Sequence, residues 1–268
     1  MHDDIRQLFD ITGKVAMVTG GARHLGYDAA SILAAAGAQL IITSREKAQA
    51  EESAVKLRGK YGVDALALAL DQSKFENVEA AVRDAKAWKG RIDILVNNAG
   101  GGSGLSPAWL FDRDPKDIDQ MLQLNLHGTM YCCREVGRVM WEQGGGKIIN
   151  IASIAGMLGR NREMYRRNNM AGQPVDYAAA KGGVISLTMD LAAMLAPRNV
   201  FVNCISPGGF ARKLSEGFVK DYSERTALGR MGRDGIDLKG AILFLASPAS
   251  DYVVGHNLVV DGGFAIWH

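Results

Sequence analysis

The segment TGGARHLG, residues 19–26, lies between the apolar run KVAMVT and an alanine-rich segment of helical periodicity. A strand that ends in glycine and leads into a helix places backbone N–H groups at the helix N-terminus, where they can bind the phosphates of a dinucleotide. A tight strand-to-helix connection without a ligand gives the same glycine pattern. His24 stands where such a turn usually has another glycine, and histidine tolerates a positive φ better than most residues. We interpret the segment as a nucleotide-binding turn.

The rest of the chain predicts the fold that contains this turn. Helical patterns occur at residues 29–36, 78–88, 117–141 and 177–195, between apolar runs that have the composition of buried parallel strands. These runs are KVAMVTG, QLIITSR, DALALALD, IDILVNNAG, KIINIAS, VFVNCIS and NLVVDGG. The 268 residues fit one domain. We predict an α/β fold in which residues 1–268 form a single-domain Rossmann-type doubly wound parallel sheet of about seven strands, with helices on both faces.

The composition argues against several classes of partner and site. The 31 basic and 29 acidic residues nearly balance, which does not suit a nucleic-acid-binding surface. No apolar run approaches the length needed to span a membrane, and the N-terminus has no apolar signal segment. Cys132, Cys133 and Cys204 form neither a disulfide framework nor a metal-binding motif. We therefore expect a cytoplasmic protein that binds no nucleic acid, membrane or metal.

The end of the second apolar run bears on the choice of cofactor. In dinucleotide-binding folds a carboxylate at this position accepts from the free 2′-hydroxyl of the adenosine ribose, whereas arginine favours a 2′-phosphate. This chain has Ser44 and Arg45, and Arg23 of the first turn can converge on the same point. The alternative is that Arg45 only begins a solvated helix, REKAQAEE. We predict NADP(H) in preference to NAD(H).

The motif DYAAAK places Tyr177 and Lys181 four residues apart, on one face of a helix. An ammonium group beside a phenol stabilises the phenolate, so the spacing predicts a lowered tyrosine pKa, suited to proton exchange with an alcohol or a ketone. Ser153 ends an apolar run upstream, and Asn125 lies in an earlier amphipathic helix. Together the four residues predict a hydride-transfer site. Tyr165 has no lysine four residues later, so it does not repeat the motif.

These motifs occur in the order typical of the short-chain dehydrogenase/reductase family, which the chain resembles from LFDITGKVAMVTGG to NLVVDGG. Further shared landmarks are NNAG at residues 97–100 and SPGG at residues 206–209. The resemblance implies that Tyr177 is the general acid/base, that Ser153 holds the substrate oxygen and that Lys181 binds the nicotinamide ribose. Asn125 would anchor a water in the proton relay. The resemblance also implies a homo-oligomer, a tetramer or a dimer, with the helices at 117–141 and 177–195 in the interface.

The resemblance extends to the residues expected to bind the cofactor. Asp71 would contact the adenine, and Pro207 and Gly208 would flank the nicotinamide. Asn97 either ties neighbouring strands through its amide or has a functional role. Arg212 departs from the family pattern PGxxxT, which has threonine there. The full expected set is Gly20, Arg23, His24, Leu25, Gly26, Ser44, Arg45, Asp71, Gln72, Asn98, Ala99, Gly100, Tyr177, Lys181, Pro207, Gly208, Phe210 and Arg212.

The segment between Ser153 and Tyr177 is longer than in most family members and contains a basic insert at about residues 157–174. Its sequence RNREMYRR has four arginines against one acid, Glu163. Arginine binds carboxylates and phosphates through paired hydrogen bonds, so we predict a small anionic substrate held by Ser153, Tyr177, Arg166 and Arg167. Sugar acids suit such a site, and the sequence is similar to gluconate 5-dehydrogenase-type members of the family. A solvated loop is the alternative.

The sequence thus predicts an oxidoreductase that uses NAD(P)(H) to interconvert a secondary alcohol and a ketone, on a sugar acid or a related polyol. The alternative enzyme is a 3-oxoacyl-[acyl-carrier-protein] reductase, which has similar cofactor motifs and whose acidic carrier protein could dock on a cationic rim. A non-catalytic NADP(H)-sensing binding protein is the alternative of another class. A sensor has no need of the combination of Asn125, Ser153, Tyr177 and Lys181, which argues against it.

Overall fold

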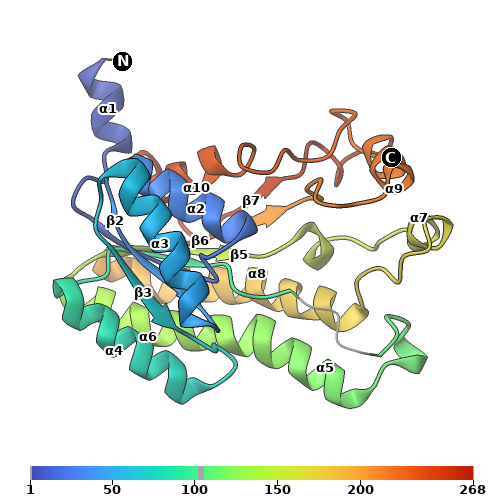
Figure 1. Cartoon of the computed structure of the whole chain (residues 1–268), viewed down its shortest axis with the longest axis horizontal. Helices are drawn as coiled ribbons and strands as arrows, with labels where there is room; N and C mark the ends of the chain where they lie inside the picture. The colour runs from blue at the N-terminus through green and yellow to red at the C-terminus, as the bar shows by residue number, and fades with distance from the viewer. Residues whose placement is uncertain (1, 102–105, 268) are drawn as a thin grey trace.

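The computed structural model describes residues 2–101 and 106–267. Parallel strands form one seven-stranded sheet in the order β3-β2-β1-β4-β5-β6-β7 (Figure 1). The strands are β1 (Val15–Thr19), β2 (Gln39–Ser44), β3 (Ala65–Ala69), β4 (Ile94–Asn97), β5 (Gly146–Ile151), β6 (Val200–Pro207) and β7 (Asn257–Val260). Each strand lies within one of the apolar runs or extends one residue beyond it, so the predicted doubly wound parallel sheet is confirmed.

Helices cover both faces of the sheet (Figure 1). On one face α2 (His24–Ala35), α3 (Lys47–Tyr61) and α10 (Lys239–Ala246) bury alanine, leucine and isoleucine side chains against the strands. On the other face α4 (Phe75–Lys89), α6 (Gly128–Gln143) and α8 (Val175–Leu195) bury alanine, valine, cysteine, methionine and leucine side chains against the strands. Four shorter helices complete the described part of the fold: α1 (Asp3–Phe9), α5 (Pro115–Leu122), α7 (Arg162–Arg167) and α9 (Glu216–Ser223).

The strand order reverses at β1, which lies between β2 and β4. Thr19 at the end of β1 is paired with Asn97 at the end of β4. From here the chain leads to α2 on one face of the sheet and to α5 and α6 on the other. Open parallel sheets bind ligands in the crevice beside such a reversal, at the carboxyl ends of the strands. The topology therefore places TGGARHLG at the rim of this crevice.

Asn97 has a structural role inside the sheet. Its Nδ2 donates to Oδ1 of Asn150 on β5 at 2.9 Å, and Asn150 Nδ2 donates to Oγ1 of Thr188 on α8 at 3.0 Å. All three residues are buried. Of the two interpretations of Asn97, the tie between neighbouring strands is the one that its contacts support.

The predicted helix at 117–141 is not continuous. One turn of π-helix, Gln123–His127, separates α5 from α6. Residues 123–127 include neither glycine nor proline, so the composition of this segment does not reveal the π turn. Asn125 lies within this turn.

Part of the basic insert forms a short helix, α7, and is not the solvated loop of the alternative interpretation. Asn161 caps α7, because its side chain accepts from the backbone N–H of Glu163 at 2.9 Å. Met164 is buried in a small apolar cluster with Phe218 and Tyr222 of α9. The insert thus packs on α9 at the end of the molecule where the C-terminus also lies (Figure 1).

The segment Val175–Arg198, which contains α8, is long and apolar enough to cross a membrane by length and composition, and no other helix of the described residues is. Buried helices meet the same criterion, and α8 packs against β6. The expectation of a protein without a membrane partner stays a prediction.

Candidate active site

The glycines of the turn after β1 allow a close approach of backbone segments. Gly20 has a φ of 60°, and a Cβ at Gly26 would collide with the Gly20 carbonyl and the Asn98 amide. Asn98 Nδ2 donates to the carbonyl oxygens of Thr19 and Gly20, at 3.0 and 3.1 Å. The turn is therefore held against the end of β4, with the first residues of α2 at the crevice.

His24 adopts the left-handed conformation that favours glycine. Its φ is 54°, which histidine tolerates at a strain of about 1 to 3 kcal/mol. Its side chain lines the crevice together with Arg23 and Arg212. Partial burial lowers the pKa of His24, the charges of Arg212 and Arg23 lower it further, and Asp234 and Asp28 oppose the shift. The imidazole is therefore mainly neutral at pH 7.

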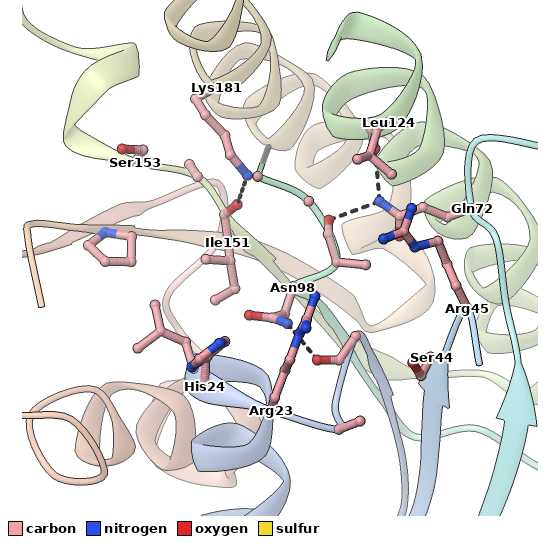
Figure 2. Close-up of a pocket in the computed structure, with 18 of the residues that line it drawn as sticks. Arg23, His24, Ser44, Arg45, Gln72, Asn98, Leu124, Ile151, Ser153 and Lys181 are labelled. Atoms are coloured by element: carbon pink, nitrogen blue, oxygen red, sulfur yellow. Dashed lines mark hydrogen bonds between the residues drawn. The ribbon is translucent and has the colours of Figure 1, made fainter. Parts of the chain in front are cut away.

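The crevice is a cleft of about 400 Å³ that gathers most of the residues expected to bind the cofactor (Figure 2). Those that line it are Gly20, Arg23, His24, Leu25, Ser44, Arg45, Asp71, Gln72, Asn98, Ala99, Gly100, Tyr177, Lys181, Pro207, Gly208 and Arg212. Gly26 packs behind the turn, and Phe210 lines a neighbouring cavity. Their location is that of a cofactor site, and their parts in binding stay predictions.

Two arginines reach into one end of this cleft (Figure 2). Arg23 comes from the turn after β1 and Arg45 from the end of β2, beside Ser44. Glu46, the first acid after β2, accepts from the Gln49 amide at 2.7 Å and does not line the cleft. Two guanidinium groups with no carboxylate at the end of β2 fit the phosphate of a 2′-phosphorylated ribose.

Asp71 and Gln72, which follow β3, line the cleft and make hydrogen bonds within its wall. Asp71 accepts from the Ser73 hydroxyl at 2.6 Å. Gln72 Nε2 donates to the carbonyl oxygens of Ala99 and Leu124, both at 2.9 Å (Figure 2). Gln72 thus joins the chain after β4 to the π turn, and its amide nitrogen is occupied by structural contacts.

Ser153, Tyr177 and Lys181 meet at the other end of the cleft. Lys181 Nζ donates to the carbonyl oxygen of Ile151 at 2.8 Å (Figure 2) and lies 5.8 Å from the centre of the Tyr177 ring. Ser153 lies two residues after the end of β5, and its side chain caps the short helix η3 (Ile154–Gly156). The three side chains that the sequence singled out from two distant segments therefore lie together.

Asn125 lies behind the cleft wall and is fully buried. Its Oδ1 accepts from the Gly101 N–H at 2.7 Å, and its Nδ2 donates to the Met121 carbonyl at 3.1 Å. A Cβ at Gly100 would lie 2.6 Å from Asn125 Oδ1 and 3.6 Å from Lys181 Nζ, so this glycine separates the two side chains. The amide of Asn125 is thus held by backbone partners, and its role in a proton relay stays a prediction.

The prediction of a lowered Tyr177 pKa is wrong. Burial raises the pKa of Tyr177, and a hydrogen bond with Ser153 and the charge of Arg160 only partly oppose this shift. Burial also lowers the pKa of Lys181, to about 8. Desolvation of the phenol therefore outweighs its charged surroundings. At neutral pH Tyr177 is protonated, which is the form that can donate a proton to a ketone.

A second cavity, of about 540 Å³, adjoins the cleft and shares Ser153, Tyr177, Pro207 and Gly208 with it. Its walls come from the insert, from α9 and from the chain after β6. Most of its surface is apolar, contributed by Met164, Met170, Phe210, Leu214, Phe218, Met231 and Phe264. This cavity is where a substrate can meet Tyr177 from the side opposite the cofactor turn.

The structure does not bring Arg166 or Arg167 into either cavity. Arg166 is exposed and pairs with Glu163 on its own helix. Nη2 of Arg167 lies 3.5 Å from Oδ2 of Asp221 on α9. Arg160, from the same basic run, lines the second cavity. Nothing in the sequence distinguishes Arg160 from its neighbours, because the helix that turns the other two outward is set by contacts with α9.

Arg212 lies at the edge of the cofactor cleft, where the family pattern has threonine. Its Nε donates to Asp234 at 2.6 Å, and its guanidinium lies over the Phe210 ring at 5.8 Å. The ion pair joins the loop after β6 to the loop before α10, so Arg212 has a structural partner as well as a place in the cleft wall.

The environment of His24 predicts a pH dependence of NADPH affinity. A neutral imidazole at pH 8 adds no charge to the cleft. Bound phosphate groups would oppose the lowering of the His24 pKa, so part of the imidazole would be protonated at pH 6 and would add a positive charge there. We expect His24→Gly to leave the Kd for NADPH unchanged at pH 8 and to raise it about two- to fivefold at pH 6. Fluorescence titration of both proteins at both pH values measures this. Equal ratios of mutant to wild-type Kd at pH 6 and pH 8 would show that His24 is only a tolerated substitution.

The sequence and the fold match known proteins over nearly their full length. Residues 20–265 match a family model described as enoyl-(acyl carrier protein) reductase. The 2-dehydro-3-deoxy-D-gluconate 5-dehydrogenase of Formosa agariphila is 36% identical over 263 residues, 96% of this chain and 94% of that protein. The chain belongs to the short-chain dehydrogenase/reductase family. This short-chain dehydrogenase is therefore an oxidoreductase that uses a nicotinamide cofactor.

Two further relatives differ in the substrates that their names state. The 3-oxoacyl-[acyl-carrier-protein] reductase FabG of Aquifex aeolicus is 35% identical, and the match covers 94% of this chain and 98% of that protein. The solved structure of a gluconate 5-dehydrogenase from Burkholderia cenocepacia, in complex with NADP and tartrate, has a TM-score of 0.87 at 35% identity. It covers 97% of this chain and 98% of that chain.

Proposed function

We propose that this short-chain dehydrogenase uses NADP(H) to interconvert a secondary alcohol and a ketone of a sugar acid or a related polyol. The observation that carries the proposal is the position of Ser153 and Tyr177, which line both the cofactor cleft and the second cavity. A substrate oxygen at this junction can meet both hydroxyl groups. The relatives named for gluconate derivatives support the substrate class, because they match almost the whole chain.

The residues of the chain can supply the proton that ketone reduction needs. The nicotinamide cofactor, when bound, supplies the hydride. Tyr177 donates its hydroxyl proton to the ketone oxygen, which becomes the alcohol, and Ser153 donates a hydrogen bond to the same oxygen. Lys181, with its ammonium 5.8 Å from the ring centre, stabilises the phenolate that remains. In alcohol oxidation the phenolate takes the proton back.

Arg45 is the residue that we expect to select NADPH over NADH. Arg45→Asp removes a guanidinium that can bind the 2′-phosphate and adds a repelling carboxylate, which can instead accept from a free 2′-hydroxyl. We expect kcat/KM for NADPH to fall about 10- to 100-fold and kcat/KM for NADH to stay the same or rise. Lys47→Asp, the same charge change two residues further on and outside the cleft, is the matched control. Equal losses with both cofactors would contradict the proposed selectivity.

The apolar walls of the second cavity favour one other candidate, reduction of a 3-oxoacyl thioester. An acyl chain would bury its methylene groups there, and FabG of Aquifex aeolicus supports this possibility by its similarity. Steady-state rates with 5-keto-D-gluconate and with a soluble 3-oxoacyl thioester, both with NADPH, separate the two functions. The proposed function requires the higher kcat/KM for the sugar acid.

We also propose a homo-oligomer that works in the cytoplasm. Large apolar side chains are exposed on the helices expected to form the interface, α6 and α8: these are Met130, Trp141, Met189 and Met194. Burial of such a surface in a second copy would remove it from water. The three cysteines are free and buried, which is compatible with a reducing compartment. Sedimentation of the purified protein measures the number of subunits.

A further inference from the structure

Two buried polar atoms in the lining of the second cavity have no hydrogen-bond partner among the described residues. They are Nη1 of Arg160 and Oε1 of Gln173. The rest of each group is held in place: Arg160 Nη2 donates to the Pro174 carbonyl at 2.9 Å, and the Gln173 carbonyl accepts from Arg162 at 3.2 Å. One donor and one acceptor of residues that line the cavity are thus buried without a hydrogen-bond partner, while the Arg160 guanidinium also interacts with the Tyr165 hydroxyl.

The Arg160 guanidinium lines the same cavity as the reacting residue Tyr177. Its charge lowers the pKa of Tyr177 and of Tyr165 against the effect of burial, and burial lowers the pKa of Arg160 itself. These mutual effects require that the guanidinium is close to both phenols. Arg160 and Tyr177 line one cavity, so a ligand of this cavity can contact both side chains.

The positive charge of Arg160 has no acidic partner among the described residues that line the cavity. None of these residues is Asp or Glu, and Glu163, the acid of the insert, pairs with Arg166 instead. Arg225, the other cation of the wall, follows α9 and donates to the Asp221 carbonyl at 3.5 Å. A partly buried charge with an unused donor in a mostly apolar cavity favours an anionic ligand.

We propose that Arg160 is the residue that binds the carboxylate of the substrate, with Gln173 accepting from a neighbouring hydroxyl. The inference rests on the proposed function and narrows its substrate class to hydroxy and keto acids. The apolar side chains of the cavity would pack on the carbon chain between the carboxylate at Arg160 and the carbonyl at Tyr177. Arg160 thus takes the role that the sequence predicted for Arg166 and Arg167.

The test compares two substrates that differ only in the anionic group, D-gluconate and D-glucitol, in oxidation with NADP. Arg160→Met should raise KM for gluconate about 10- to 100-fold, with kcat changed only a few-fold and with glucitol unaffected. Arg160→Lys keeps the charge without the fork and should recover part of the loss. Arg166→Met removes the same charge outside the cavity, so it should leave KM unchanged for both substrates. NADPH affinity and melting temperature of each variant show that it is folded.

The binding of tartrate to the protein–NADPH complex, followed by calorimetry, gives a second measurement that needs no turnover. Arg160→Met should abolish it, and Arg166→Met should keep it. Equal changes of KM for gluconate and glucitol in Arg160→Met, or an unchanged KM for gluconate, would overturn the role of Arg160. If the wild type oxidises neither substrate, the proposed function is wrong. The calorimetric measurement of tartrate binding then tests the role of Arg160 by itself. Tartrate binding that only Arg160→Met loses supports the site, whereas binding absent from the wild type or retained by Arg160→Met overturns it.

Discussion

We expect Tyr177→Phe to lower kcat for ketone reduction by about 10²- to 10⁴-fold while NADPH still binds with its original affinity. The substitution removes only the hydroxyl that donates the proton, and the ring keeps its packing against the Lys181 helix face. Because the pKa of Tyr177 is raised, the phenol is protonated over the whole neutral range, so the loss should be as large at pH 6 as at pH 8. Steady-state kinetics and an NADPH titration measure the two quantities.

Tyr165→Phe is the matched control for this prediction. Tyr165 also lines the second cavity, with its ring 5.4 Å from that of Phe218, but it has no lysine four residues later. Removal of the Tyr165 hydroxyl by this substitution should change kcat by less than about tenfold. Activity retained by Tyr177→Phe, or a comparable loss in Tyr165→Phe, would contradict the assignment of Tyr177 as the proton donor.

We expect the largest loss of stability when the ion pair next to the catalytic tyrosine is broken. Arg113 Nη2 donates to Asp176 Oδ2 at 2.8 Å, and both side chains are almost completely buried. Asp176→Ala leaves a guanidinium that has lost its closest carboxylate, at a cost of about 3 to 5 kcal/mol in the free energy of unfolding. Denaturant unfolding of both proteins measures the difference, and Glu52→Ala, which removes an exposed pair with Lys56, should cost little.

A double variant separates the ion pair from mere packing. Arg113→Met combined with Asp176→Leu removes both charges of this pair, so it should recover part of the stability that Asp176→Ala loses, although Asp117 then loses its contact with Arg113. Asp176 directly precedes Tyr177, and this pair joins the start of α8 to the chain before α5. A loss in Asp176→Ala no larger than that in Glu52→Ala would show that the buried pair does not stabilise the fold.

The fold was predictable from the sequence because its strands are buried on both faces. Each strand is a continuous apolar run, and such runs leave a parallel sheet covered by helices as the arrangement that buries them. Gly20 and Gly26 could be placed at a ligand turn for a local reason, since the backbone there has no room for a Cβ. Tyr177 and Lys181 could be paired because helical spacing alone brings them to one face.

What the sequence missed depends on contacts between distant segments. The π turn that holds Asn125 contains neither glycine nor proline that would mark it, and the helix in the insert forms because Met164 packs on α9. The same packing turns Arg166 away from the cavity and leaves Arg160 in its wall. The sign of the Tyr177 pKa shift follows from how deeply the phenol is buried, which residue spacing does not report.

We propose that this protein transfers hydride from NADPH to the ketone of a sugar acid, with Tyr177 as the proton donor. The most direct measurement mixes the protein with NADPH and 5-keto-D-gluconate and follows the nicotinamide absorbance, with Tyr177→Phe measured in parallel. We predict steady oxidation of NADPH by the wild type and almost none by Tyr177→Phe. Tight NADPH binding without turnover of this ketone, of neutral keto sugars or of a 3-oxoacyl thioester would contradict the claim and would indicate a cofactor-sensing binding protein.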